Sequence, residues 1–380
     1  MAFLRRRLRL SFFVMCELLE GGEQRSMNRN AEVLPIEVLF RKEVRKDSRV
    51  KNAYLLVHSD KTGVHIELSE GRGDNGIPTP QQPIYMASVG KLFTSVVVSM
   101  LHEKGVLSFE DRISYYLDSG LIQGLHVYKG KEHSSEIQIR HLLNQTSGLP
   151  DNFYPLFEKL LADHDFDITP REAVEWAKMN LTPQAVPGRK ACYTDTNYHL
   201  LGLIVEKVCG EPFHAVLKNL IFDPIGMKHA YMLHYSEPEK ASPQPEAGFY
   251  IDQTRLNDIK GFAGIDYAGG GVVAPLEDLL LFMKALVGHQ LVSKETLAIM
   301  RSDKALLNPG FDYGYGIWQV RTIPLLIPAK YKSWGVLGAT GAYMFYHPEL
   351  NAYVIGNFNH IAWQRKCVRF MFRVMDRLRE

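Results

Sequence analysis

Cysteine is scarce in this chain of 380 residues: Cys16, Cys192, Cys209 and Cys367 stand far apart. None belongs to a C-x-x-C pair, and the 14 histidines show no H-E-x-x-H spacing. Neither a disulfide framework nor a metal site is therefore predicted. We expect reduced, buried thiols, which favour a cytoplasmic setting.

Long hydrophobic runs are missing as well. No segment reaches the about 20 apolar residues that a transmembrane helix needs, so no membrane span is predicted. The N-terminus has the basic start and short apolar run of a signal peptide, but Glu17 and Glu20 interrupt it and no small-x-small cleavage site follows. We expect residues 1–45 to be a disordered extension.

The chain also lacks an excess of charge. Its 44 Lys and Arg residues nearly balance 42 Asp and Glu residues, which leaves a formal net charge of +2. Such a balance gives no electrostatic basis for a nucleic-acid partner. With 46% hydrophobic residues, the composition is that of a globular protein. The composition says nothing about oligomeric state.

Two common enzyme motifs are absent or out of context. No G-x-S-x-G elbow occurs, which excludes the α/β-hydrolase fold. Gly71, Gly73 and Gly76 fit the dinucleotide pattern G-x-G-x-x-G, but prolines follow them where a helix should begin. No nucleotide cofactor is therefore expected.

The remaining pattern predicts strands at both ends and helices between them. Residues 52–70 read as a β-hairpin with a turn at residues 61–63, and residues 88–104 are apolar nearly all round, as in a buried central helix. Residues 105–265 look mainly helical, residues 313–357 alternate in strand fashion, and a basic amphipathic helix closes the chain. We predict an α+β domain over residues 46–380. Its antiparallel sheet is flanked by helices, with a mainly helical lobe inserted at about 105–265.

The motif Ser-x-x-Lys occurs twice, beginning at Ser48 and at Ser88. Ser48 lies in a charged stretch and is expected to be solvated surface. Ser88 opens the apolar helix, and the three-residue spacing places Lys91 on the same face of its first turn. A lysine that is desolvated at a helix N-terminus has its charged form disfavoured, so neutral Lys91 could accept the proton of Ser88. The alternative is a capping serine with a snorkelling lysine.

Several longer segments support the catalytic interpretation. They occur in the order MASVGKLFTS, IQIRHLLNQTSGLP, PGRKACYTDTNYHLLGLIVE, IFDPIGMKHA, AGGGVVAPLEDLLLF and GATGAYMFYHPEL. Over roughly residues 50–360 the chain resembles class C β-lactamases, D-alanyl-D-alanine carboxypeptidases and their family VIII esterase relatives. The resemblance implies a β-lactamase/transpeptidase-like fold and a serine hydrolase that works through an acyl-enzyme, without a cofactor.

The resemblance also assigns further site residues. The Tyr-x-Asn element of the family reads here Tyr193-Thr194-Asp195, so Tyr193 is expected to complete the proton relay. Asp195 replaces the amide, and its carboxylate can accept from Lys91 but cannot donate to a substrate. The strand element that normally carries a lysine or histidine reads residues 336–338, ending at Gly338, and holds no cation. The N–H groups of Ala339 and Ser88 are expected to form the oxyanion hole.

The missing cation bears on the substrate. We expect Val336 to lie at the mouth of the site, where it cannot pair with a carboxylate, and this favours neutral esters or amides. One alternative is a D-alanyl-D-alanine carboxypeptidase or β-lactamase whose carboxylate partner is another residue. A further alternative is a non-catalytic, penicillin-binding-like sensor.

Overall fold

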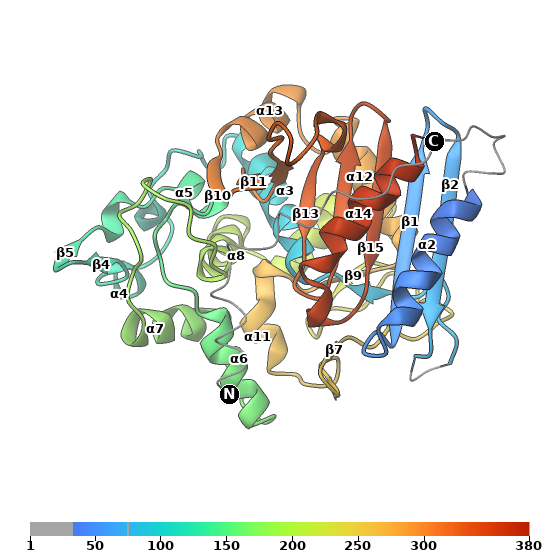
Figure 1. Ribbon diagram of the computed structural model, residues 1–380. Helices are drawn as coiled ribbons and strands as arrows, with labels where there is room; N and C mark the ends of the chain where they lie inside the picture. The colour runs from blue at the N-terminus through green and yellow to red at the C-terminus, as the bar shows by residue number, and fades with distance from the viewer. Residues whose placement is uncertain (1–32, 74–75, 380) are drawn as a thin grey trace.

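A computed structural model describes residues 33–73 and 76–379 and shows a large antiparallel sheet covered by helices (Figure 1). Its eight strands lie in the order β10-β11-β12-β13-β14-β15-β1-β2. Their bounds are β1 (Asn52–Ser59), β2 (Val64–Gly71), β10 (Ala305–Asn308), β11 (Phe311–Tyr313), β12 (Trp318–Val320), β13 (Trp334–Leu337), β14 (Tyr343–His347) and β15 (Ala352–Asn357). Both ends of the chain thus build one sheet, and the α+β prediction is confirmed.

The predicted hairpin forms β1 and β2. Its turn follows Ser59 and contains Gly63, whose φ of 74° is one that glycine adopts without strain. Tyr54 is paired with Ser69 on one side and with Asn357 on the other, so β1 lies inside the sheet. Alternate side chains of β1 therefore enter two separate cores, one on each face of the sheet.

The inner face of the sheet is covered by α3 (Gly90–Glu103), α12 (Leu276–Val287) and α13 (Lys294–Ser302). Helix α3 is buried on nearly all sides, as its apolar sequence predicts, and it packs against α8 (Thr196–Cys209) of the lobe. A short 3-10 turn, η1 (Ala87–Val89), precedes it and follows strand β3 (Ile84–Tyr85). β3 pairs with β9 (Val272–Ala274), which in turn pairs with β6 (Tyr231–Met232).

The outer face is covered by α2 (Val33–Lys46) and α14 (Lys366–Arg377), which lie side by side (Figure 1). The amphipathic α14 was predicted, but α2 was not. Residues 33–45 belong to the fold rather than to a disordered extension, because Ile36 and Phe40 are fully buried. The signal-like stretch and Cys16 lie outside the described residues. Of the other cysteines, Cys192 and Cys367 are buried, and all three are free thiols.

The middle of the chain forms a mainly helical lobe. Its helices are α4 (Ser119–Ile122), α5 (Ile139–Leu143), α6 (Phe153–Ala162), α7 (Pro170–Asn180), α8 (Thr196–Cys209), α9 (Phe213–Leu217), α10 (Asp223–Ile225) and α11 (Phe262–Asp266). Two small hairpins accompany them, β4 (Val127–Tyr128) with β5 (Lys131–Glu132) and β7 (Tyr250–Ile251) with β8 (Thr254–Arg255). Thr169 and Glu172 form the predicted capping box of α7. Within the described residues, no helix combines the length and apolar character needed to cross a bilayer.

Candidate active site

Ser88 lies where β3 turns into α3, and it is partly exposed. Ala87, just before it, has a φ of 50°, a left-handed conformation that costs free energy for any residue but glycine. Two contacts impose this turn. The N–H of Met86 donates to the carbonyl of Val272 at 3.0 Å, and Gly90 lies so close to Gly270 that an added Cβ would be 2.1 Å from its oxygen.

Lys91 is fully buried and donates from Nζ to three acceptors. They are Ser88 Oγ at 3.0 Å, the carbonyl of Gly269 at 2.7 Å and the carboxylate of Asp195. Burial by itself would lower the pKa of Lys91, but the charge of Asp195 raises it above its ordinary value. Lys91 is therefore an ammonium ion, and the prediction of a neutral lysine that accepts the Ser88 proton is wrong.

Tyr193 lies beside Lys91, whose Nζ is 5.2 Å from the centre of the ring. The ring packs edge-on against Tyr313 of β11 and at a tilt against Trp318 of β12. Burial raises the pKa of the Tyr193 phenol above its ordinary value, and the charge of Asp195 adds to this, whereas Lys91 lowers it. Its phenolate therefore depends on Lys91 for stabilisation.

The position of Tyr193 and Asp195 is set by Gln145, which the sequence did not single out. Its side chain donates to the carbonyl of Thr194 at 3.2 Å and accepts from the N–H of the same residue at 3.0 Å. Asn197 donates to the same Gln145 oxygen at 2.7 Å. Two of the segments that carry the family resemblance are thus joined at the site.

Two further carboxylates surround Lys91 and were also missed. Asp151 accepts from the N–H of Asp195 at 2.9 Å, and Asp266 accepts from the hydroxyl of Tyr85 at 2.8 Å. Burial raises the pKa of each to about 7, and the charge of Asp195 adds to the effect. No local sequence pattern marks either residue. The site therefore has one ammonium ion facing three carboxylates.

The end of β13 closes the other side of the site. Gly338 packs so tightly that an added Cβ would lie 2.7 Å from the carbonyl of Met86, which places residues 338–339 against the turn before Ser88. Within the described part of the chain, the N–H groups of Ser88 and Ala339 have no backbone acceptor. Both are therefore available to a ligand oxygen.

Val336 does not lie at the mouth of the site as predicted. Its side chain is fully buried and belongs to the core cluster on the inner face of the sheet, with Val89 and Met344. A lysine or histidine at this position would have to place its charge within that core. The position of Val336 therefore gives no support to the effect on substrate choice that we predicted for it.

Ser48 is exposed after α2, as expected. His199 is buried between two backbone carbonyls, those of Asp195 and Gly264, each 3.0 Å from a ring nitrogen, and so has a structural role.

The chain is similar in sequence to a known protein family and to several curated proteins. A sequence model of the family described as Beta-lactamase matches residues 45–368. Penicillin-binding protein 4* of Bacillus subtilis is 28% identical over 256 residues, which are 63% of this chain and 52% of the relative. A putative D-alanyl-D-alanine carboxypeptidase of Escherichia coli is 32% identical over 147 residues, which are 38% of this chain and 32% of the relative. The chain thus spans about half the length or less of these curated relatives.

Solved structures confirm the fold. D-amino acid amidase from Ochrobactrum anthropi, complexed with D-phenylalanine, superposes with a TM-score of 0.76 at 19% identity and covers 92% of this chain and 99% of its own. EstCE1, a hydrolase with promiscuous acyltransferase activity, gives 0.75 at 17% identity with the same coverage. The predicted β-lactamase/transpeptidase-like fold is therefore confirmed. Since the family model also spans most of the sequence, the chain belongs to the beta-lactamase family.

Proposed function

We propose that this protein is a serine hydrolase that cleaves ester or amide bonds through an acyl-enzyme on Ser88. The observation that carries the proposal is the 3.0 Å contact between Lys91 Nζ, which is buried, and the Oγ of Ser88, which is partly exposed to solvent. A serine that only capped the helix would not need a buried ammonium ion beside its hydroxyl, which costs free energy to desolvate.

Because Lys91 is already protonated, the base in this proposal is the phenolate of Tyr193. The Ser88 hydroxyl attacks the carbonyl carbon while its proton passes to Tyr193, and Lys91 stabilises the phenolate before the transfer. The oxyanion is held by the N–H groups of Ser88 and Ala339. Tyr193 then protonates the leaving group. In deacylation, water attacks the acyl-enzyme and gives its proton to Tyr193, which returns a proton to Ser88 as the acid product leaves.

The charges of the site favour neutral substrates over anionic ones. Asp195 offsets the ammonium ion of Lys91, and the ionisation of Asp151 and Asp266 as pH rises through about 7 makes the site negative. A substrate carboxylate that enters would add a further negative charge. The names of the structural relatives, an amidase and a hydrolase with acyltransferase activity, are consistent with uncharged esters and amides. The second candidate is a D-alanyl-D-alanine carboxypeptidase, which the name of the Escherichia coli relative favours.

Steady-state hydrolysis of a neutral short-chain nitrophenyl ester, compared with benzylpenicillin and an acylated D-Ala-D-Ala peptide, tests this preference. We divide kcat/KM for each substrate by its uncatalysed rate constant and expect this ratio to be at least about tenfold higher for the ester. The disadvantage of the anionic substrates should grow as pH rises through about 7, because Asp151 and Asp266 ionise there. Ser88→Ala serves as the inactive control. Faster turnover of the anionic substrates at every pH would favour the carboxypeptidase instead.

A further inference from the structure

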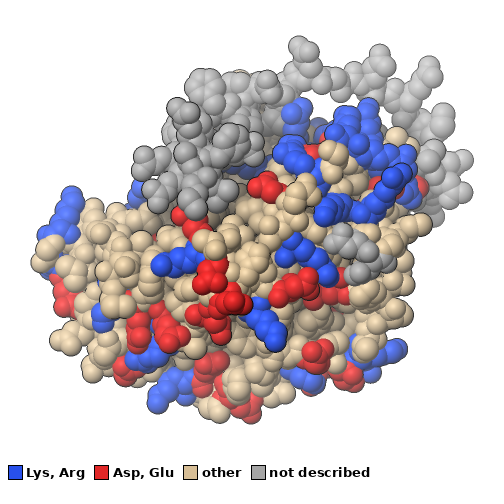
Figure 2. Space-filling model, turned by 90° about the horizontal axis from the view of Figure 1, so that it is seen from below, with Lys and Arg blue, Asp and Glu red and all other residues tan. Residues whose placement is uncertain are grey.

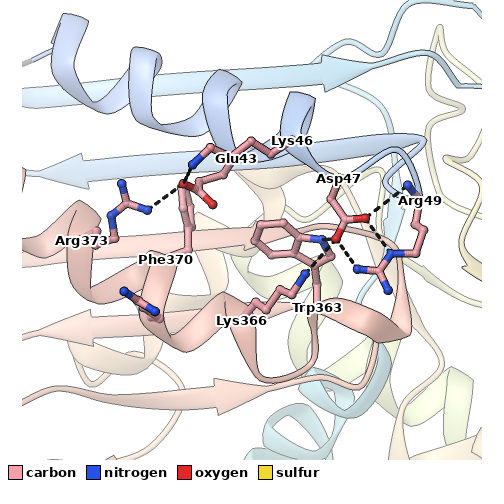
Figure 3. Close-up of a pocket in the computed structure, with 9 residues that line it drawn as sticks. Glu43, Lys46, Asp47, Arg49, Trp363, Lys366, Phe370 and Arg373 are labelled. Atoms are coloured by element: carbon pink, nitrogen blue, oxygen red, sulfur yellow. Dashed lines mark hydrogen bonds and ion pairs between the residues drawn. The ribbon is translucent and has the colours of Figure 1, made fainter. Parts of the chain in front are cut away.

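A pocket lies between the C-terminal end of α2 and the first turns of α14, on the face of the sheet opposite to Ser88. We call it the α2–α14 pocket; its volume is about 520 Å³ (Figure 3). In the view from below, Lys and Arg side chains gather on the side of the molecule where α2 and α14 lie (Figure 2). The pocket is lined by Glu43, Lys46, Asp47, Arg49, Trp363, Lys366, Arg369, Phe370 and Arg373.

The lining is strongly cationic. It contains five basic side chains and two carboxylates, so its net charge of +3 exceeds the +2 of the whole chain. Such a concentration of like charge is unfavourable unless an anion offsets it. The pocket therefore differs from an ordinary surface of mixed charges.

The two carboxylates orient the basic side chains but occupy only some of their N–H donors. Asp47 accepts from Arg49 at 2.6 Å and from Lys366 at 2.9 Å, and Glu43 accepts from Arg373 at 2.8 Å (Figure 3). A guanidinium has five N–H donors and an ammonium three, so most remain available. These three basic side chains are still between 42% and 51% exposed.

Arg369 lies on the exposed face of α14 and lines the same pocket. It has no hydrogen bond or ion pair with any of the residues that the structure describes. Trp363 and Phe370, both nearly buried, provide a rigid apolar wall beside it. The pocket thus combines cations held by carboxylates with one guanidinium whose donors have no acceptor among the described residues.

We propose that the α2–α14 pocket binds a phosphate-bearing anion. Arginine forks match the geometry of phosphate oxygens in pairs, and several cations around one pocket suit a group with more than one negative charge. Either a soluble phosphate compound or the headgroup of an anionic lipid can supply this chemistry. The site lies across the sheet from Ser88 and is independent of the hydrolase activity.

Calorimetric titration with inorganic pyrophosphate and sedimentation with vesicles of equimolar phosphatidylcholine and phosphatidylglycerol test the proposal on the whole protein. We expect binding in at least one of the two experiments and weakening at higher salt. Binding of pyrophosphate identifies a soluble phosphate as a sufficient ligand, whereas binding to vesicles alone identifies the lipid headgroup. Binding in neither experiment overturns the proposal.

The variant Arg369→Glu locates the site. Since Arg369 has no partner among the described residues, its loss should leave the melting temperature unchanged and weaken binding by about tenfold or more. The matched control is Arg112→Glu, which makes the same charge reversal at an exposed arginine of the helical lobe. If Arg369→Glu binds as tightly as the wild-type protein, or if Arg112→Glu is weakened equally, the pocket is not the site.

Discussion

Replacing Asp195 with asparagine removes one negative charge from the group around Lys91 and restores the amide that the family usually carries there. The amide oxygen can still accept from Lys91, so the geometry should survive. The charge of Asp195 raises the pKa of both Lys91 and Tyr193, and its removal must lower both. A charge at such short range changes a pKa by about 1 to 3 pH units.

The proposed base is the Tyr193 phenolate, so activity should rise with pH as the phenol ionises. A lower pKa moves this rise to lower pH, and one pH unit changes the ionised fraction about tenfold. We therefore expect Asp195→Asn to be about tenfold or more faster than wild type near neutral pH on a neutral ester.

The assay is kcat/KM as a function of pH for wild type and for Asp195→Asn. Asp165→Asn, at an exposed carboxylate of the lobe, is the matched control and should leave the profile unchanged. A profile of Asp195→Asn that stays in place or moves to higher pH would refute the assignment of Tyr193 as base. A folded but inactive Asp195→Asn would show instead that the carboxylate is itself required for the proton transfer.

Three further predictions concern the relay and its surroundings. Lys91→Ala and Tyr193→Phe should each reduce turnover by about 100-fold or more, and the double variant should be little worse; near-normal activity of Tyr193→Phe would exclude it from the relay. Burial raises the pKa of Asp266 from 3.8 to about 7, so the ionised carboxylate destabilises the folded state. This destabilisation is absent below pH 3.8 and complete once the pH has risen through 7. The difference in unfolding free energy between Asp266→Asn and wild type, measured by urea denaturation, should therefore grow in favour of the variant as pH rises from acidic to mildly alkaline, by at most about 4 kcal/mol. A difference that does not depend on pH would contradict this. Gly90→Ala should lower the free energy of unfolding by about 1 to 3 kcal/mol, because the added Cβ would lie 2.1 Å from a backbone oxygen. In the control Gly310→Ala the nearest atom would be 3.5 Å away, so the free energy of unfolding should change little. Equal stability of the two variants would contradict the close approach at Gly90.

Much of the fold could be predicted because its signals are local or periodic. The apolar run after Ser88 indicates a buried helix, and the alternation of residues 52–70 indicates a hairpin, since each pattern has the period of its own structure. The spacing of Ser88 and Lys91 within one helical turn likewise needs no knowledge of distant contacts. The structure brings these two side chains together at 3.0 Å.

What could not be predicted depends on distant parts of the chain. Asp151 and Asp266 belong to segments far from Lys91 in sequence, and no local pattern links them to it. The prediction of a neutral Lys91 considered its burial and the helix N-terminus but not the charge of Asp195, which raises the pKa of Lys91. Val336 was placed by analogy with a strand motif, but the packing of the sheet against α3 decides which face its side chain occupies. Helix α2 carries apolar residues at Ile36, Phe40 and Val44, but only their packing against the outer face of the sheet shows that this segment belongs to the fold.

Intact-mass measurement after incubation with a serine-directed fluorophosphonate, followed by peptide mapping, tests the central claim most directly. The account predicts a single adduct on the peptide that carries Ser88, an adduct that disappears in Ser88→Ala and persists in Ser48→Ala, the other Ser-x-x-Lys serine. An unlabelled wild-type protein, or a label that remains in Ser88→Ala, would contradict the assignment of Ser88 as the nucleophile.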